Sequence, residues 1–352
     1  MGTEIETDTV VVGAGVAGLN AAYLLQESQR VQVLEARDQI GGRLASAEVN
    51  GAPIDLGATW IWPDEPLVSA TTSKHKLETF LQYDAGDAMF QTNETVERIP
   101  GQQFSSSSFR LNKGARSIAQ ALFDKLNPDT VQLEQAVHTI TEHDTHISVQ
   151  TNTTTAIANH VIVAVPPATA IELIEFNGEL PEPLPQLMRQ TPVWMGTIVK
   201  VVAVYEHPFW RDAGLSGSAF SYSGPMREIH DMSGPNGQPA ALFGFAQPGP
   251  TDPTPTQEAI ISQLVSLFGS DAEQPQQIYI KDWRQEKFTS PTQTPTLSVA
   301  QTYGHDLYQT PTFGGRLHMA STETASTFPG HIEGALTAST RAANATKSQA
   351  SQ

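Results

Sequence analysis

The stretch TVVVGAGVAGLNAAYLL, Thr9–Leu25, decides the fold of this chain. An apolar run, three glycines spaced as G-x-G-x-x-G and an apolar helical segment follow one another without a gap. A second apolar run, Val31–Leu34, ends at Glu35, 22 positions after Gly13. Strand, glycine turn, helix, strand and acidic residue at this spacing predict a βαβ unit that binds a dinucleotide.

Each glycine of this unit has a predicted task. Gly13 permits the tight turn, Gly15 lets the backbone approach a pyrophosphate, and Gly18 lets the helix lie close to the strand. The helix N-terminus adds unpaired N–H groups and the positive end of a dipole. Glu35 would accept a hydrogen bond from a ribose hydroxyl, which argues against a 2′-phosphate. The predicted cofactor contacts here are Gly13, Gly15, Val16, Ala17, Gly18, Glu35, Ala36 and Arg37.

A second glycine pair follows in the sequence IGGR, Ile40–Arg43, whose arginine could reach the same pyrophosphate from the other side. The runs LEARDQIGGR (Leu34–Arg43) and PIDLGATWIW (Pro53–Trp62) resemble the FAD-binding opening of the flavin amine oxidases, the group that contains monoamine oxidase, polyamine oxidase and L-amino acid oxidase. Protoporphyrinogen oxidases and phytoene desaturases share this opening less closely. The resemblance implies that the cofactor is FAD.

Length and patterning set the expected architecture. The chain has 352 residues, 39% of them hydrophobic, which suffices for two domains. Val161–Val165 reads as a buried parallel strand, and Leu111–Leu126 and Glu65–Leu81 read as helices. The resemblance implies the α/β class, with a Rossmann-like (GR2-type) FAD-binding domain and a second α+β substrate domain built on a mixed sheet. The expected ranges are 1–82 with 112–190 and 284–347 for the FAD-binding domain, 83–111 with 191–283 for the substrate domain, and 348–352 for a disordered tail.

The helical lid of the resembled family is expected to be reduced. In that family a large helical insertion precedes the helix predicted at Leu111–Leu126, whereas here only Tyr83–Asn112 fills this place. The substrate site should therefore be more open, or be covered by a partner subunit in a homodimer.

Composition excludes several classes of function. Cysteine is absent, which excludes disulfides, thiol catalysis and a flavin bound through cysteine, so FAD should be held non-covalently. The formal net charge of −17 speaks against nucleic acid or an anionic membrane as a partner, and it either attracts a cationic substrate or serves solubility alone. The first strand begins close to Met1 and no apolar stretch approaches about 18 residues, which predicts a cytoplasmic protein. No metal site is predicted, because the histidines His138, His143, His146 and His160 lack ligand-like partners.

A lysine interrupts an apolar strand at Lys200. The strand GTIVKVVAVYE, Gly196–Glu206, alternates so that Lys200 shares a face with Val202 and Val204. A buried ammonium is costly unless it is paired or neutral, so this lysine has a partner or a purpose, or else it lies on an edge strand and faces solvent. The pattern MG-x-x-x-K, followed by HPFWRDAGLSG (His207–Gly217), resembles the amine oxidase segment that supplies the active-site lysine. The resemblance implies that Lys200 holds a water against flavin N5 and assists reoxidation by oxygen.

Two further segments resemble the same family. Trp283, in YIKDWRQEKF, resembles the tryptophan that packs beside the isoalloxazine ring, although it could be an ordinary core indole. The segment GRLHMASTETASTFPGHIEGA, Gly315–Ala335, resembles the family segment that passes under the flavin, with Glu323 near the pyrophosphate. His331 could act as a base or hydrogen-bond donor above the flavin, or only cap a helix. The resemblance adds these cofactor contacts: Gly41, Gly42, Arg43, Gly57, Ala58, Thr59, Trp60, Val137, Val165, Pro166, Trp283, Glu323, Thr324, Gly330, His331 and Ile332.

The aromatic pair that flanks the amine path in monoamine oxidases is not recognisable. One of its positions matches His331, and the other falls in Thr289–Pro295, which contains no tyrosine. This apparent loss puts an arylalkylamine in doubt and favours another amine, an amino acid or a non-amine C–H donor.

The sequence therefore predicts an FAD-dependent amine or amino-acid oxidase, with Lys200, His331 and Trp283 as catalytic residues. It would oxidise a C–N bond by hydride transfer to flavin N5 and reduce O2 to H2O2. The alternatives are a flavin-dependent desaturase or dehydrogenase of a non-amine substrate, and a flavin-binding protein with little turnover.

Overall fold

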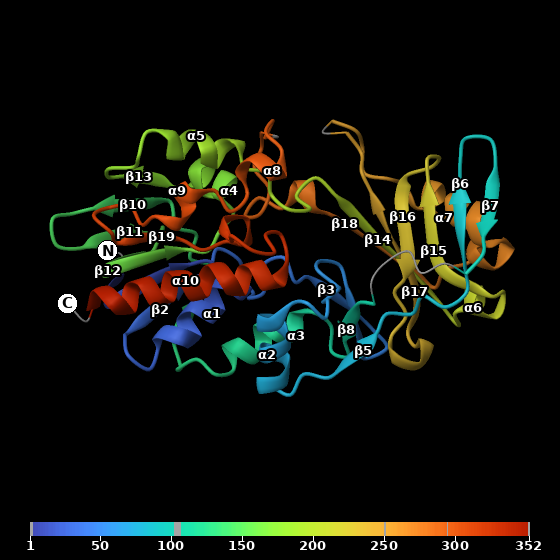
Figure 1. Cartoon of the computed structure of the whole chain (residues 1–352), viewed down its shortest axis with the longest axis horizontal. Coiled ribbons are helices and arrows are strands. Elements are labelled where there is room, and N and C mark those ends of the chain that lie inside the picture. Colours follow the sequence, from blue (N-terminus) through green and yellow to red (C-terminus); the bar gives the residue numbers. More distant parts are fainter. Residues whose placement is uncertain (1–2, 102–106, 250, 294, 351–352) are drawn as a thin grey trace.

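The chain folds into two lobes, each built on a β-sheet (Figure 1). The computed structural model describes residues 3–101, 107–249, 251–293 and 295–350. The first lobe contains an eight-stranded sheet, and the second lobe contains a seven-stranded sheet.

The first lobe begins with the predicted βαβ unit. Strand β1 (Thr3–Val12), helix α1 (Val16–Leu25) and strand β2 (Val31–Leu34) follow in order, and the two strands pair in parallel. Gly13 makes the turn with a φ of 100°, and its N–H donates to the carbonyl of Leu34 at 2.8 Å. The prediction for this unit is therefore confirmed.

Six more strands extend this sheet. The order across it is β13-β10-β11-β12-β1-β2-β9, and β19 pairs with the end of β12. Strands β12, β1, β2 and β9 are parallel neighbours, as expected for a Rossmann-like sheet, whereas β11 pairs antiparallel with β10 and β12. The bounds are β9 (Val131–Gln132), β10 (Thr139–Glu142), β11 (Ile147–Gln150), β12 (Thr154–Val163), β13 (Glu175–Asn177) and β19 (Leu317–Met319).

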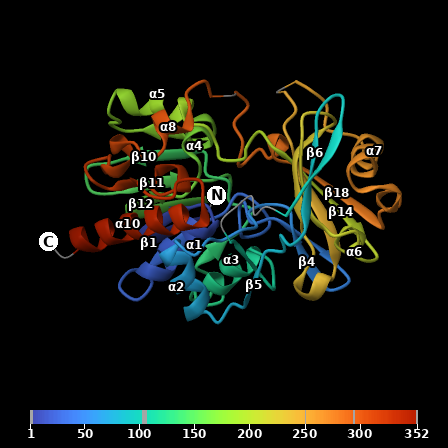
Figure 2. The ribbon, with the colours of Figure 1, turned by 45° about the vertical axis from the view of Figure 1, so that its right-hand side comes forward.

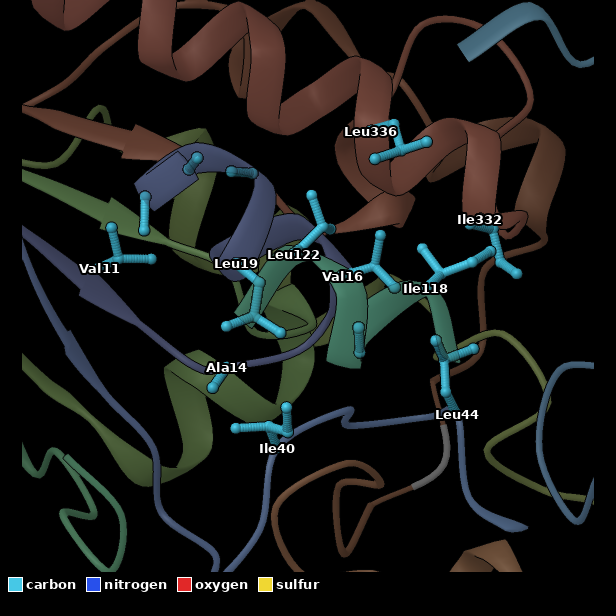
Figure 3. Packing of buried hydrophobic residues seen from close by; sticks show 14 of the residues in the cluster. Val11, Ala14, Val16, Leu19, Ile40, Leu44, Ile118, Leu122, Ile332 and Leu336 are labelled. Carbon is cyan, nitrogen blue, oxygen red and sulfur yellow. The ribbon is translucent and has the colours of Figure 1, made fainter. Parts of the chain in front are cut away.

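Alternate residues of the central strands pack against different helices. Val11 and Ile162 face a cluster made with α1, α3 (Arg116–Phe123) and α10 (Ile332–Ala350). Figure 3 shows side chains from all three helices meeting there. The neighbouring residue Val12 faces a second cluster, formed with α4 (Pro167–Leu173) and α5 (Pro183–Gln190) on the opposite face of the sheet. This sheet is therefore covered on both faces, as parallel sheets require.

The second lobe is a mixed sheet of order β18-β14-β17-β16-β15-β6-β7. Neighbouring strands of this sheet are antiparallel, except for β15 and β6, which are parallel. Helix α7 (Gln257–Phe268) packs on the face that lies away from the first lobe (Figure 2). The bounds are β6 (Asp87–Gln91), β7 (Val96–Ile99), β14 (Val199–Tyr205), β15 (Leu215–Ser221), β16 (Met226–Asp231), β17 (Ala240–Ala246) and β18 (Gln277–Asp282).

Two small two-stranded sheets and several short helices complete the fold. Strand β3 pairs with β4 and strand β5 pairs with β8, in both cases antiparallel. The remaining bounds are β3 (Ser46–Val49), β4 (Ala52–Asp55), β5 (Thr79–Leu81), β8 (Phe109–Leu111), α2 (Pro66–Lys74), α4 (Pro167–Leu173), α5 (Pro183–Gln190), α6 (Phe209–Asp212), α8 (Val299–Thr302) and α9 (Asp306–Gln309).

Three sequence predictions need correction. The helix predicted over Glu65–Leu81 ends at Lys74, because Lys76 takes a positive φ and the following residues form β5. The helix predicted over Leu111–Leu126 begins only at Arg116, after a turn at Gly114 with a φ of 70°. The predicted disordered tail, 348–352, is wrong for 348–350, since α10 continues through Ala350, and 351–352 lie outside the described residues.

The strands of the first sheet all come from 1–82, 112–190 and 284–347, and those of the second from 83–111 and 191–283. The division into two discontinuous domains stays a prediction, and this distribution supports it. Within the described part of 83–112 the chain forms β6, β7 and β8 and no helix. No helix in the described residues is both long enough and apolar enough to cross a membrane.

Candidate functional site

A cavity of about 670 Å³ lies between the two lobes. The first lobe contributes the glycine turns and the N-terminal ends of α1 and α10, and the second lobe contributes Lys200, Glu228 and Phe245. Most of the predicted site residues line this cavity. They are Gly13, Gly15, Val16, Ala17, Glu35, Ala36, Arg37, Gly41, Gly42, Arg43, Gly57, Ala58, Thr59, Trp60, Val137, Val165, Pro166, Lys200, Trp283, Gly330, His331 and Ile332.

Three predicted contacts do not line the cavity: Gly18, Glu323 and Thr324. A Cβ at Gly18 would lie 1.8 Å from the carbonyl oxygen of Gly13, so this glycine serves the close packing of α1 on the turn. Thr324 donates its hydroxyl to the carbonyl of Ser321 at 2.7 Å, and Glu323 is fully buried. For these residues direct cofactor contact stays a prediction that the cavity lining does not support.

The glycine turns form a cradle that fits a dinucleotide. Helix α1 begins directly after Gly15, so the N–H groups of its first turn have no hydrogen-bond partner within the helix. The backbones of Gly15 and Gly41 form an isolated parallel β-bridge, and Gly42 has a φ of 56°. A Cβ at Gly42 would lie 3.3 Å from the Cα of Gly15, so a larger residue would crowd the space between the two glycine turns. A pyrophosphate fits such N–H groups and their positive dipole.

Glu35 is fixed at the end of β2. Its carboxylate accepts from the N–H of Ala14 at 2.6 Å and from the N–H of Arg37 at 2.9 Å. The residue is only 4% exposed, yet it lines the cavity. Because a carboxylate offers about four acceptor positions, two remain for ribose hydroxyls.

Arg43 and Glu323 form a bidentate ion pair, with N–O distances of 2.6 and 3.1 Å. The carboxylate of Glu323 also accepts from the N–H of Trp194 at 3.2 Å. Arg43 lines the cavity and Glu323 lies behind it. Glu323 thus orients the guanidinium, while the guanidinium is the group that can meet an anion.

Lys200 is buried on an interior strand of the second sheet. Strand β14 lies between β17 and β18, and the residue is 2% exposed, so the alternative of a solvent-facing edge lysine is wrong. Its Nζ donates to the carbonyl of Gly57 at 2.9 Å and to the hydroxyl of Thr59 at 2.5 Å. The Nζ also lies 4.5 Å from the centre of the Phe243 ring. Burial lowers the pKa of Lys200 to about 7, against the opposing effect of the Asp55 carboxylate.

Trp283 and His331 stand on other walls of the cavity. Trp283 is 5% exposed, and its indole N–H donates to the carbonyl of Leu56 at 3.0 Å. The His331 ring is held by Glu65, with 2.7 Å between Nδ1 and Oε1. This bond leads away from α10, so within the described residues the ring does not cap that helix.

Sequence reasoning missed several lining residues. Trp62, Trp194 and Phe245 add aromatic surface to Trp60, so aromatic walls exist although Thr289–Pro295 supplies no tyrosine. Trp62 could have been found, because it is the last residue of the PIDLGATWIW motif. Glu65 had no sequence signal, because it meets His331 only through the fold. Glu228 bonds His230, two positions further along β16, but no motif marked this pair as part of a site.

Comparison with known proteins agrees with this geometry. A family model described as flavin containing amine oxidoreductase matches residues 94–346, and one described as an NAD(P)-binding Rossmann-like domain matches residues 11–73. A putative flavin-containing monoamine oxidase, AofH, of Mycobacterium tuberculosis is 29% identical, over 96% of this chain and 95% of that protein. A putrescine oxidase of Kocuria rosea is 27% identical, over 95% of this chain and 94% of that protein.

A solved structure shows the same fold. Cyclohexylamine oxidase from Brevibacterium oxydans superposes with a TM-score of 0.87 at 21% identity, covering 98% of this chain and 100% of that one. The alignment with AofH is 440 positions long although this chain has 352 residues, so the relative carries segments without a counterpart here. The family model spans well over half of the chain, and the cavity has the residues that FAD requires. The chain therefore belongs to the flavin-containing amine oxidoreductases and is an FAD-dependent oxidoreductase.

Proposed function

We propose that this protein is an oxidase of aliphatic amines that carry a second cationic group. FAD would be held by the glycine turns around Gly15 and Gly42 and by Glu35. When bound, it would supply the redox chemistry that moves a hydride equivalent from the carbon beside the amine nitrogen to O2, with H2O2 as a product. The observation that carries the proposal is the placement of Lys200 and Glu228 on one cavity wall, with aromatic side chains around them.

The surroundings of Lys200 suit a role in the reaction with oxygen. Two acceptors, the Gly57 carbonyl and the Thr59 hydroxyl, hold its ammonium in place. A preorganised positive charge in a buried site stabilises negative charge that develops on oxygen or on a bound water. Because burial lowers the pKa of Lys200 to about 7, the group can also give up a proton near neutral pH.

The Glu228 carboxylate supplies the negative charge that binds the second cationic group of the substrate. It follows the start of β16 and lines the cavity, and its Oε1 lies 2.6 Å from Nε2 of His230. Trp60 and Phe245 line the same region and offer ring faces to a cation. The similarity to the putrescine oxidase of Kocuria rosea supports a diamine.

A substrate panel tests this proposal. We expect 1,4-diaminobutane to bleach the flavin anaerobically at lower concentration than butylamine, and air to restore the yellow colour with release of H2O2. The substitution Glu228→Gln should remove the preference for the diamine and leave butylamine oxidation. Bleaching without rapid recovery in air would favour a dehydrogenase, and no bleaching by any amine would favour a flavin-binding protein. A cytoplasmic location, a homodimer and non-covalent attachment of FAD stay predictions from the sequence.

A further inference from the structure

Glu65 and His331 form a hydrogen-bonded pair at the wall of the cavity. They lie 266 positions apart in the chain, and 2.7 Å separates Glu65 Oε1 from His331 Nδ1. The other carboxylate oxygen accepts from the N–H of Trp62 at 2.9 Å. The Glu65 side chain is 1% exposed, whereas 31% of the His331 side chain remains accessible. The carboxylate is therefore enclosed, and only the histidine faces the cavity.

Aromatic rings fix the plane of the imidazole. The Trp62 ring centre lies 4.9 Å from that of His331 at an interplanar angle of 38°. Trp194 and Phe328 follow at 6.4 and 6.2 Å. Within the described residues no hydrogen bond involves Nε2 of His331, and the residue lines the cavity. The ring thus offers one nitrogen to Glu65 and leaves the other for a ligand.

Several charged groups surround the His331 ring, and Glu65 is the one bonded to it. Its nearest carboxylate is Glu65, which has no other cationic partner in the described residues. Glu333 belongs to α10 as well, but its carboxylate is taken up by the N–H groups of Leu67 and Val68. The charges of Arg43 and Glu323 cancel, because the two side chains form an ion pair. The positive end of the α10 dipole disfavours a further positive charge close to the N-terminus of that helix. Lys200 lines the same cavity from the other lobe. Glu65 is therefore the group that offsets charge on His331.

We propose that Glu65 is a positioning residue that holds the Nδ1–H of His331, so that Nε2 of His331 accepts the proton of the substrate ammonium. The proposal rests on the proposed amine oxidation. His331 contacts the substrate in this proposal, whereas Glu65 acts only through His331.

The proton transfer removes an obstacle to amine oxidation. An ammonium nitrogen has no lone pair to stabilise the cation that forms when its neighbouring carbon loses a hydride. In the proposed step one N–H bond of the ammonium breaks and an Nε2–H bond forms, which leaves a neutral amine and an imidazolium. A carboxylate bonded to the far nitrogen fixes the tautomer and stabilises the imidazolium, and this is its role in other histidine–carboxylate pairs.

The tautomer provides a test that needs no turnover. In the holoenzyme labelled with ¹⁵N-histidine, we expect the neutral His331 ring to carry its hydrogen on Nδ1, with His331→Asn identifying the signal by its loss. A hydrogen on Nε2 instead would overturn the proposal, because that nitrogen could then accept nothing.

The reductive half-reaction tests the proton acceptor. Anaerobic stopped-flow mixing with 1,4-diaminobutane across pH 6–10 would compare the parent with three variants. His331→Asn keeps an N–H for Glu65 but lacks Nε2, so the limiting rate of flavin reduction should fall roughly 100-fold. Glu65→Gln should slow reduction roughly tenfold and move the midpoint of its pH profile to lower pH by about one unit. Glu78→Gln is the matched control, since this exposed carboxylate bonds Asn112 outside the cavity.

The outcomes separate this proposal from the proposed function. Parent-like rates and pH profiles in His331→Asn, or equal profiles for Glu65→Gln and Glu78→Gln, would overturn the role of the pair while amine oxidation stands. If no amine reduces the parent flavin, the amine proposal fails, and the tautomer measurement still decides whether Glu65 positions His331.

Discussion

Among the described residues of the second lobe, Lys200 places an ammonium at the cavity wall, and replacement by methionine removes it. Methionine has a similar length and packs well against aromatic rings, and Phe243 and Phe245 already surround Nζ at 4.5 and 5.8 Å. We therefore expect Lys200→Met to fold and to bind FAD nearly as the parent does.

The magnitudes follow from the contacts of Nζ. The Gly57 carbonyl and the Thr59 hydroxyl each lose a donor, which costs about 1 kcal/mol apiece, while the desolvation of a buried ammonium is relieved. The net change in unfolding free energy should stay within about 2 kcal/mol. Reoxidation by O2 should slow roughly 10- to 1000-fold, as when one preorganised electrostatic group is removed. Anaerobic reduction of the flavin should change less.

Double-mixing stopped-flow absorbance measures both half-reactions. Since burial lowers the pKa of Lys200 to about 7, its charge is lost as pH rises, and the parent should reoxidise more slowly at pH 9 than at pH 6. Lys200→Met should lack this pH dependence. Lys74→Met is the matched control, because Lys74 also lies over an aromatic ring, that of Tyr23, but is exposed outside the cavity. Equal reoxidation rates in Lys200→Met and the parent would refute the role of Lys200.

Three other perturbations test the cofactor cradle and the core. Glu35→Arg should lower FAD occupancy, read from the flavin-to-protein absorbance ratio, because it removes the ribose acceptor; unchanged occupancy would contradict the placement of the adenosine half. Gly57→Ala should lower both Tm and FAD content, since its Cβ would lie 1.9 Å from the Arg43 carbonyl oxygen. Burial lowers the pKa of His318 to about 4, so its contribution to stability is present above about pH 6.5 and is lost as pH falls towards 4. Urea unfolding should show a loss of about 2 kcal/mol between pH 7 and pH 5 that is absent in His318→Leu; an equal loss in that variant would assign the effect elsewhere.

Local backbone rules explain what the sequence could predict. Gly13 needs a positive φ and Gly18 needs the absence of a Cβ, so the glycine spacing by itself specifies the first βαβ unit. Strand alternation placed Lys200 on one face with Val202 and Val204, and these two valines do form a cluster with Phe243. Such features depend on neighbours in the chain, which a single sequence displays.

Long-range pairing explains what the sequence could not predict. Residues 79–81 read as the end of a helix, but they form β5 because Phe109–Leu111 lies beside them. Glu65 directly precedes α2, and nothing in its local sequence marks it as a site residue. It becomes part of the site because the fold brings Nδ1 of His331 to 2.7 Å from its Oε1. The aromatic walls come from Trp62, Trp194 and Phe245, none of which occupies the position where the family motif would place a tyrosine.

The three predicted catalytic side chains share one support, the stretch Leu56–Glu65 between β4 and α2. Trp283 donates to the first carbonyl of this stretch, Lys200 to the next carbonyl and to a threonine hydroxyl, and His331 contacts its final carboxylate. Lys200 and Trp283 come from the second lobe, where β14 pairs with β18, and His331 comes from the first lobe. The stretch therefore links two groups of one sheet to a third group that this sheet does not reach. A displacement at Gly57 should therefore disturb all three together. The steric restriction at this glycine accordingly affects the whole site, and substrate oxidation and flavin reoxidation should change jointly when a Cβ is added there.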